Sequence, residues 1–218
     1  MKEKEQERLE RLKEIEKDLY VKGFGKICGI DEAGRGPLAG PVVVAAVIMP
    51  ENSFIEGIND SKKVSEKKRE KLYDEITQNA VAWGVGIIDE KEIDNINILN
   101  ATKKGLTTAL KQLSEKPDII LVDALTGIDT LGIPYQSIIK GDAKSYSIAS
   151  ASIIAKVTRD RIMREWDEIY PQYGFKKHKG YGTKAHIEAI KNNGICPIHR
   201  KTFVKNFEPL GTGSKKLT

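Results

Sequence analysis

Acidic residues follow three apolar segments of the sequence that have the character of β-strands. Asp31 and Glu32 follow the first segment, Asp123 ends the second, and Asp142 lies just beyond the third. A carboxylate at the end of an apolar strand is costly to desolvate unless it is paired or holds a cation, and clustered carboxylates also repel one another. A bound divalent metal ion would offset both costs, so these acids are candidate metal ligands.

Carboxylate oxygens favour particular ions and a particular chemistry. Magnesium and manganese prefer oxygen ligands, and a pair of such ions can activate a water and stabilise the leaving oxygen in phosphodiester hydrolysis. The alternative is that each acid merely caps a neighbouring helix or turn, which fits Asp142 best because a helix is predicted a few residues later. Neighbours on a regular strand point to opposite faces, so Asp31 and Glu32 can share one site only if a bulge or a strand end occurs at Asp31.

The hydrophobic pattern predicts the elements that would position these acids. Strands are expected at residues 26–31, 41–49, 81–88, 118–123 and 135–140, and helices at residues 1–20, 66–78, 95–115, 147–169 and 184–193. The helix at 1–20 carries only a thin apolar stripe and is expected at the surface. Because a glycine-rich link favours a hairpin between the first two strands and later strands alternate with helices, the predicted class is α/β with a mixed sheet.

Composition and charge narrow the class of protein further. With 39% hydrophobic and 31% charged residues, the 218-residue chain is expected to form one globular domain, and two distant cysteines predict no disulfide framework. No apolar run reaches the roughly 18 residues of a spanning helix and no export signal is visible, so we expect a cytoplasmic protein that binds no membrane. The net charge of +5 is concentrated at residues 176–205, where eight basic residues accompany one acid. Such a surface either contacts phosphates or is simply solvated.

One long motif resembles the signature of a known enzyme family. Residues 29–41, Gly-Ile-Asp-Glu-Ala-Gly-Arg-Gly-Pro-Leu-Ala-Gly-Pro, are similar to the signature of bacterial ribonuclease HII, and blocks at 59–63, 121–123, 140–142, 149–160 and 178–183 follow in the family's order. The resemblance implies a ribonuclease H-like fold, with a mixed β-sheet flanked by helices and a C-terminal helical portion that clamps the substrate. It implies a catalytic domain at residues 23–210, between a charged helical extension at 1–22 and a flexible tail at 211–218.

The resemblance also implies roles for individual residues. Asp31, Glu32, Asp123 and Asp142 match the family's four catalytic carboxylates, which hold two Mn²⁺ or Mg²⁺ ions when substrate is bound. Other residues match its substrate-binding positions: Gly34, Arg35 and Gly36, which read the ribose 2′-hydroxyl; Ser61, Lys62 and Lys63, which lie near phosphates; and Tyr181, which stacks beside the sugar at an RNA to DNA junction. Without the resemblance, the two lysines would be a charged helix entry and the tyrosine a core or surface aromatic.

The activity implied by the resemblance is hydrolysis of RNA that is paired with DNA. A member of the family cuts the RNA strand of RNA/DNA hybrids and incises 5′ of ribonucleotides embedded in duplex DNA, leaving 3′-hydroxyl and 5′-phosphate ends. It acts in the removal of misincorporated ribonucleotides and RNA primers. The expected partners are therefore hybrid duplexes and ribonucleotide-containing DNA, bound by a monomeric enzyme.

Three other functions compete with this one. Ribonuclease HIII has the same fold, but the Gly34-Arg35-Gly36 tripeptide is the HII form, and the N-terminal segment is too short for the additional substrate-binding domain of HIII. Cys196 and His199 suggest a zinc-stabilised binding module, yet their spacing does not complete a four-ligand site, and a pure binder has no use for strand-end acids. A nucleophilic hydrolase would need a Gly-x-Ser-x-Gly turn, whereas the serines at 145, 147, 150 and 152 sit in a helix-like run without such a turn and are interpreted as packing residues.

Overall fold

A mixed five-stranded sheet forms the centre of the molecule, in a computed structural model whose described residues are 3–207. The strands are β1 (Ile27–Ala33), β2 (Val42–Ile48), β3 (Ala82–Ile88), β4 (Ile119–Asp123) and β5 (Tyr135–Ile138). Their order across the sheet is β3-β2-β1-β4-β5, with β2 antiparallel to its neighbours and with β4 and β5 parallel to β1. The predicted hairpin and the α/β class with a mixed sheet are therefore confirmed.

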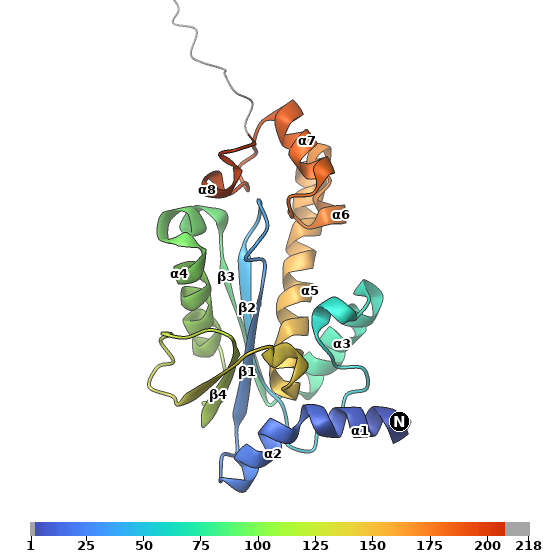
Figure 1. Cartoon of the computed structure of the whole chain (residues 1–218), viewed down its shortest axis with the longest axis vertical. Helices are drawn as coiled ribbons and strands as arrows, with labels where there is room; N and C mark the ends of the chain where they lie inside the picture. Colours follow the sequence, from blue (N-terminus) through green and yellow to red (C-terminus); the bar gives the residue numbers. More distant parts are fainter. Residues whose placement is uncertain (1–2, 208–218) are drawn as a thin grey trace, which may run out of the picture.

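Helices cover both faces of this sheet (Figure 1). α4 (Glu90–Lys111) lies on one face, and α5 (Tyr146–Ile169) and α3 (Glu66–Asn79) lie on the other. α5 approaches β1 closely at Gly29, where a Cβ atom would lie 2.0 Å from the carbonyl carbon of Ser147. Any larger residue would push the helix away, so Gly29 sets the distance between α5 and the strand that carries Asp31 and Glu32.

The N-terminal segment forms two helices instead of the single one predicted. α1 (Glu3–Leu12) and α2 (Glu14–Val21) meet at Lys13 and lie across the end of the sheet opposite α7 (Figure 1). Leu9 and Leu12 are buried in one core cluster with side chains of β2 and α5, and Leu19 is buried in another with side chains of β1 and β4. The predicted apolar stripe is real, but the rest of the protein covers it.

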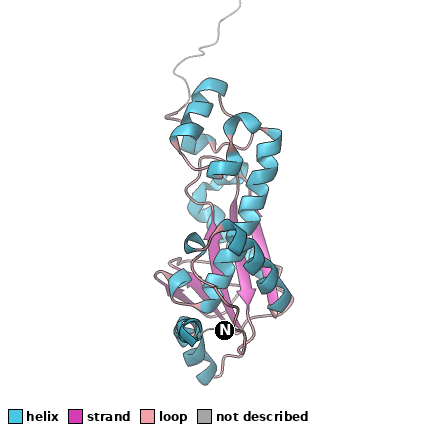
Figure 2. Cartoon of the chain, turned by 90° about the vertical axis from the view of Figure 1, so that its right-hand side faces the viewer, coloured by secondary structure: helices cyan, strands magenta, loops and turns pink. Residues whose placement is uncertain are grey.

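The C-terminal part is a small helical cluster around the tip of the hairpin formed by β1 and β2. It contains α6 (Phe175–His178), α7 (Lys184–Asn193) and α8 (Lys201–Val204), and it lies at the opposite end of the molecule from α1 (Figures 1 and 2). Backbone hydrogen bonds join the tip to it, from Leu38 N to Gly180 O (2.8 Å) and from Gly40 N to Ile198 O (2.8 Å). The predicted C-terminal helical portion is confirmed.

Two elements differ from their predictions in ways that have clear causes. α4 begins five residues earlier than residue 95, because the Asp89 side chain caps its first turn, and it is kinked at Asn97, where φ is 67°. β5 was predicted as an apolar core strand, but it is an exposed edge strand, since its sequence Tyr-Gln-Ser-Ile offers no continuous apolar face.

The ends of the chain and its relation to membranes complete the description. The predicted tail at 211–218 lies outside the described residues. No helix within residues 3–207 combines the length and the apolar character needed to cross a membrane.

Candidate active site

Asp31 lies near the carboxyl end of β1, and Asp123 is the last residue of the adjacent parallel strand β4. The register pairs Ile30 of β1 with Val122 of β4, which brings the next residue of each strand to the same edge of the sheet. Asp31 is buried, with its Oδ1 accepting a hydrogen bond from the Glu32 amide at 2.8 Å. Burial, and then repulsion from Glu32 and Asp123, raise the pKa of Asp31 well above its usual value. The two aspartates are therefore in each other's electric field, as strand-end placement predicted.

Glu32 joins this group without the backbone irregularity that was predicted. β1 pairs regularly with β2 through Asp31, Glu32 and Ala33, so the expected bulge or strand end at Asp31 is wrong. β4 ends at Asp123, which is partly exposed. Burial raises the pKa of Glu32 and the charge of Asp123 adds to the effect, while Arg35, whose guanidinium lies 3.5 Å from Glu32 Oε1, opposes it.

Asp142 reaches the same edge from a short 3-10 turn, η2 (Gly141–Ala143). The left-handed conformation of Lys140 turns the chain inward after β5, and the Gly141 amide donates a hydrogen bond to Asp123 Oδ1 at 2.7 Å. Asp142 is buried, and burial together with the charges of Asp60 and Asp123 raises its pKa. Asp142 does not cap the helix that follows it, α5, because the Ser145 side chain does so.

The four carboxylates have the donor chemistry of a magnesium or manganese site. They supply only oxygen ligands, and the pKa values of Asp31, Glu32 and Asp142 are raised first by burial and further by the charges of neighbouring acids, costs that a bound cation would offset. Within residues 3–207, no three His, Cys, Asp or Glu side chains are already arranged to hold an ion. The acids are thus neighbours in an open edge rather than a closed cage, which suits ions that retain several waters and also bind phosphate oxygens.

The Ser61-Lys62-Lys63 segment forms a second 3-10 turn, η1, on the α5 side of the sheet. Ser61 is buried and its hydroxyl accepts a hydrogen bond from Ser152 at 2.8 Å. The Lys62 amine lies 3.8 Å from Asp142 Oδ2. Burial lowers the pKa of Lys62, but the charges of Asp142 and nearby acids outweigh burial and raise it. Lys63 instead lines a separate pocket with residues of α1. Lys62 therefore adjoins a carboxylate directly, and Ser61 is linked to the group through Ser152.

The Gly34-Arg35-Gly36 loop and Tyr181 adjoin one another next to the carboxylates. Gly34 has a φ of +99°, and a Cβ there would lie 2.1 Å from Arg159 Nε, so the loop conformation requires glycine. At Gly36 a Cβ would lie 3.8 Å from the Tyr181 ring, which is itself 44% exposed. A glycine backbone, an exposed aromatic ring and a group of acids therefore surround one open surface.

Comparisons with known proteins agree with this arrangement. A family model described as "Ribonuclease HII" matches residues 28–206. The chain belongs to the ribonuclease HII family. It is 62% identical over 205 residues to "Ribonuclease HII" of Acetivibrio thermocellus, covering 94% of this chain and 80% of the relative. It is 56% identical over 203 residues to "Ribonuclease HII" of Clostridioides difficile, covering 93% of this chain and 79% of the relative. As a member of this family the chain is a ribonuclease H enzyme, and the ribonuclease HIII alternative is wrong.

Solved structures of the family share the fold. "Crystal structure of the ribonuclease H2 from Pyrococcus horikoshii OT3" superposes with a TM-score of 0.71 at 30% identity, covering 84% of this chain and 97% of that one. "Structure of the PCNA:RNase HII complex from Archaeoglobus fulgidus" gives a TM-score of 0.68 at 27% identity, covering 85% and 98%. The predicted ribonuclease H-like fold is confirmed.

Several residues of this ribonuclease HII site were missed or misread from the sequence. Ser152 was interpreted as a packing residue, but its hydroxyl donates to the Ser61 hydroxyl and lies beside Asp31, where it opposes the rise in the pKa of that carboxyl. Arg200 and Lys179 were counted with the phosphate-binding surface, but both are buried. Helical spacing could have found Ser152, since it lies two turns after the helix-capping Ser145.

The histidines form a buried hydrogen-bonded chain instead of a zinc site. The Cys196 amide donates to His199 Nδ1 (2.9 Å), the Nε2 atoms of His199 and His186 lie 3.0 Å apart, and His186 Nδ1 lies 3.0 Å from Tyr181 O. Because His199 Nδ1 accepts, its Nε2 carries the proton and donates to His186, whose Nδ1 then donates to Tyr181. The histidines do cluster, but the ring nitrogens of His186 and His199 already form hydrogen bonds, and one of these bonds holds the Tyr181 carbonyl.

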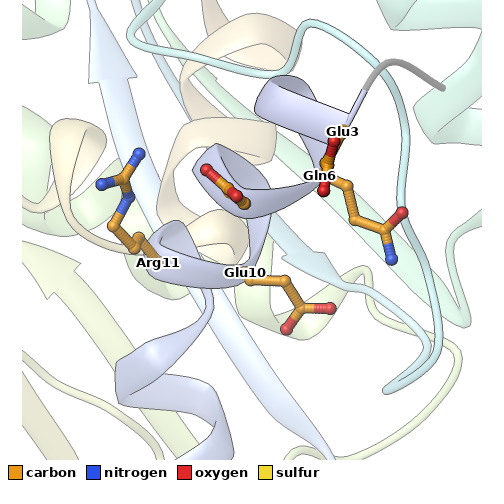
Figure 3. A pocket seen from close by; sticks show the side chains of 5 residues that line it. Glu3, Gln6, Glu10 and Arg11 are labelled. Carbon is orange, nitrogen blue, oxygen red and sulfur yellow. The ribbon is translucent and has the colours of Figure 1, made fainter.

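A shallow pocket of about 610 Å³ lies on α1, and none of the four carboxylates lines it. Its lining comes from one helix, and in Figure 3 Gln6 and Glu10 point to one side while Arg11 points away from them. Nothing in this lining converges on a common point, so the pocket adds no second reaction centre.

Proposed function

We propose that the chain hydrolyses the RNA strand of RNA/DNA hybrids and incises 5′ of ribonucleotides embedded in duplex DNA. The products would be 3′-hydroxyl and 5′-phosphate ends, and the role would be removal of misincorporated ribonucleotides and RNA primers. One observation carries the proposal: the group of strand-end carboxylates lies beside a backbone loop and an exposed tyrosine suited to a ribose. The first feature is suited to phosphodiester cleavage and the second to the choice of where to cut.

Asp31, Glu32, Asp123 and Asp142 are the proposed ligands of two Mn²⁺ or Mg²⁺ ions. When bound, such ions supply an activated water and stabilise the charge on the leaving oxygen. The acids hold the ions at the edge of the sheet, and Lys62, next to Asp142, adds positive charge for the phosphate. A protein of the same fold, titled "Crystal structure of Bst-RNase HIII in complex with Mn2+", binds manganese, which is consistent with this assignment.

Selection of the ribonucleotide falls to the Gly34-Arg35-Gly36 loop and Tyr181. A glycine backbone can come close enough to a ribose for its N–H and C=O groups to meet the 2′-hydroxyl, which DNA lacks. The Tyr181 ring, next to Gly36, offers a flat surface for the neighbouring sugar. Six exposed lysines of the C-terminal cluster would hold the duplex through its phosphates: Lys176, Lys177, Lys184, Lys191, Lys201 and Lys205.

The remaining expectations complete the proposal. Residues 23–210 would act as the catalytic domain, with the segment 1–22 packed against it as an extension. The enzyme would work as a monomer in the cytoplasm.

The proposal is tested by mapping the cut in a duplex that contains one ribonucleotide. With Mg²⁺ or Mn²⁺, we expect a single nick on the 5′ side of the ribonucleotide, with a 5′-phosphate on the downstream fragment. The matched all-DNA duplex should remain intact. Cleavage of both duplexes, or cleavage on the 3′ side of the ribonucleotide, would contradict the proposed recognition and chemistry.

A further inference from the structure

Arg200 is a fully buried arginine whose hydrogen bonds all go to one loop. Its Nη2 donates to Gly34 O (2.6 Å), its Nη1 to Arg35 O (3.0 Å) and its Nε to Gly40 O (2.9 Å). Within residues 3–207, no carboxylate lies within 4 Å of the guanidinium to offset its charge. Burying a charge in this way is costly. The carbonyl groups of the loop accept all three hydrogen bonds of its side chain, so arginine and loop depend on each other.

The three hydrogen bonds also determine where the amides of the loop point. In a trans peptide the C=O of one residue and the N–H of the next point in opposite directions, and the described residues contain no cis peptide. By holding the carbonyls of Gly34 and Arg35, Arg200 turns the N–H groups of Arg35 and Gly36 away from the interior. Both residues are exposed, and neither N–H donates a hydrogen bond within the described chain.

Arg200 is itself held from two sides. Its amide donates to Leu38 O at 2.8 Å, and its guanidinium lies 5.1 Å from the centre of the Phe203 ring. Asp94 of α4 caps the following helix by accepting hydrogen bonds from the amides of Lys201 (2.7 Å) and Thr202 (2.9 Å). The position of the guanidinium is therefore set by α4 and α8 before any substrate arrives.

We propose that Arg200 is a positioning residue that presents the Arg35 and Gly36 amides to the ribose 2′-hydroxyl. This inference rests on the proposed function, because it explains how the loop is prepared for the ribonucleotide. A planar guanidinium is required, since its fork reaches three carbonyl groups at once, whereas a lysine amine is a single point charge. Arg159, also fully buried, holds the far end of the loop through Ala39 O and Pro41 O.

The test compares discrimination rather than activity. Binding is measured in Ca²⁺ for a duplex with one ribonucleotide and for the same all-DNA duplex, and the ratio of the two Kd values is compared between the native chain and Arg200→Lys. This ratio does not depend on the fraction of folded protein. We expect it to fall about 3- to 10-fold in the variant, as for loss of one net hydrogen bond. Val204→Ala, a buried change in the helix that follows Arg200, should lower the melting temperature and leave the ratio unchanged.

The outcomes separate positioning from simple stabilisation. If Arg200→Lys melts at a lower temperature but keeps the native ratio, Arg200 only stabilises the fold and the inference is wrong. If Arg200→Lys is not folded, Asp94→Ala decides the matter, because it loosens the anchor of Arg200 from a half-buried site and should also lower the ratio. A native chain that binds both duplexes equally would refute the proposed function itself, and the inference with it.

Discussion

Acid should destabilise the protein through the buried histidine pair. Burial lowers the pKa of His186 and of His199 to about 4, below the ordinary 6.5. The unfolded chain therefore takes up protons first as the pH falls, so stability is lost from pH 6.5 downward and the loss is complete below about pH 4. For one histidine, linkage gives a loss of about 2 kcal/mol between pH 7 and pH 5.

The assay is urea unfolding of the native chain and of His186→Asn at pH 7.0, 6.0 and 5.0. Asparagine can still donate to Tyr181 O, but it has no proton to gain. The acids with raised pKa values, Asp31, Glu32 and Asp142, shift stability in the opposite direction as the pH falls, and they are common to both proteins. The decisive quantity is therefore the difference between the two proteins. We expect the native chain to lose about 2 kcal/mol more than the variant by pH 5. Equal losses of unfolding free energy in the two proteins would show that the pKa of His186 is not lowered in the folded state.

Three substitutions test the substrate-binding surface. Gly34→Ala places a Cβ atom against Arg159 in a residue whose φ is +99°. We expect the unfolding free energy to fall by about 1 to 3 kcal/mol and the discrimination between ribonucleotide and deoxyribonucleotide to be lost. Native-like discrimination would refute the need for glycine. Lys62→Ala should weaken duplex binding about 3- to 10-fold and lower the slope of log Kd against log salt concentration by about one. An unchanged slope would place Lys62 away from the phosphates. Tyr181→Phe should retain the preference for an RNA to DNA junction, and Tyr181→Ala should lose it. The preference is measured by comparing cleavage of junction and hybrid substrates. If the two variants change this preference equally, stacking by the ring is excluded.

The sequence predicted those features that depend on local pattern. Periodicity and flanking glycines or prolines located the hairpin, β4 and α5, and the bounds of α7 were predicted to the residue. The carboxylates were singled out because a charged residue after an apolar strand is costly, a rule that needs no partner to be known. The regular pairing at Glu32 contradicts the predicted bulge or strand end, but the charge of Asp123 still raises the pKa of Glu32, so the predicted grouping of these acids does not depend on that backbone detail.

The features that escaped prediction depend on contacts between distant segments. Arg200 meets Gly34 and Arg35 across more than 160 residues, and its acceptors are backbone carbonyls, which leave no trace in residue type. The same holds for the histidine chain that ends at the Tyr181 carbonyl. A buried arginine and an exposed lysine also look alike in a count of charges, which is why the predicted phosphate surface included Arg200.

The central claim is that the strand-end carboxylates hold the ions on which RNA cleavage depends. The most direct measurement is cleavage of a single-ribonucleotide duplex against Mn²⁺ concentration, for the native chain, Asp123→Asn and Asp118→Asn. Asp118 is the matched control, because its carboxylate lies at the other end of β4 and accepts hydrogen bonds from Gly25 and Lys26. We predict no cleavage in chelator, native-like cleavage by Asp118→Asn, and a loss of about 100-fold or more for Asp123→Asn at saturating Mn²⁺. Full cleavage in chelator, or native rates for Asp123→Asn, would contradict the account.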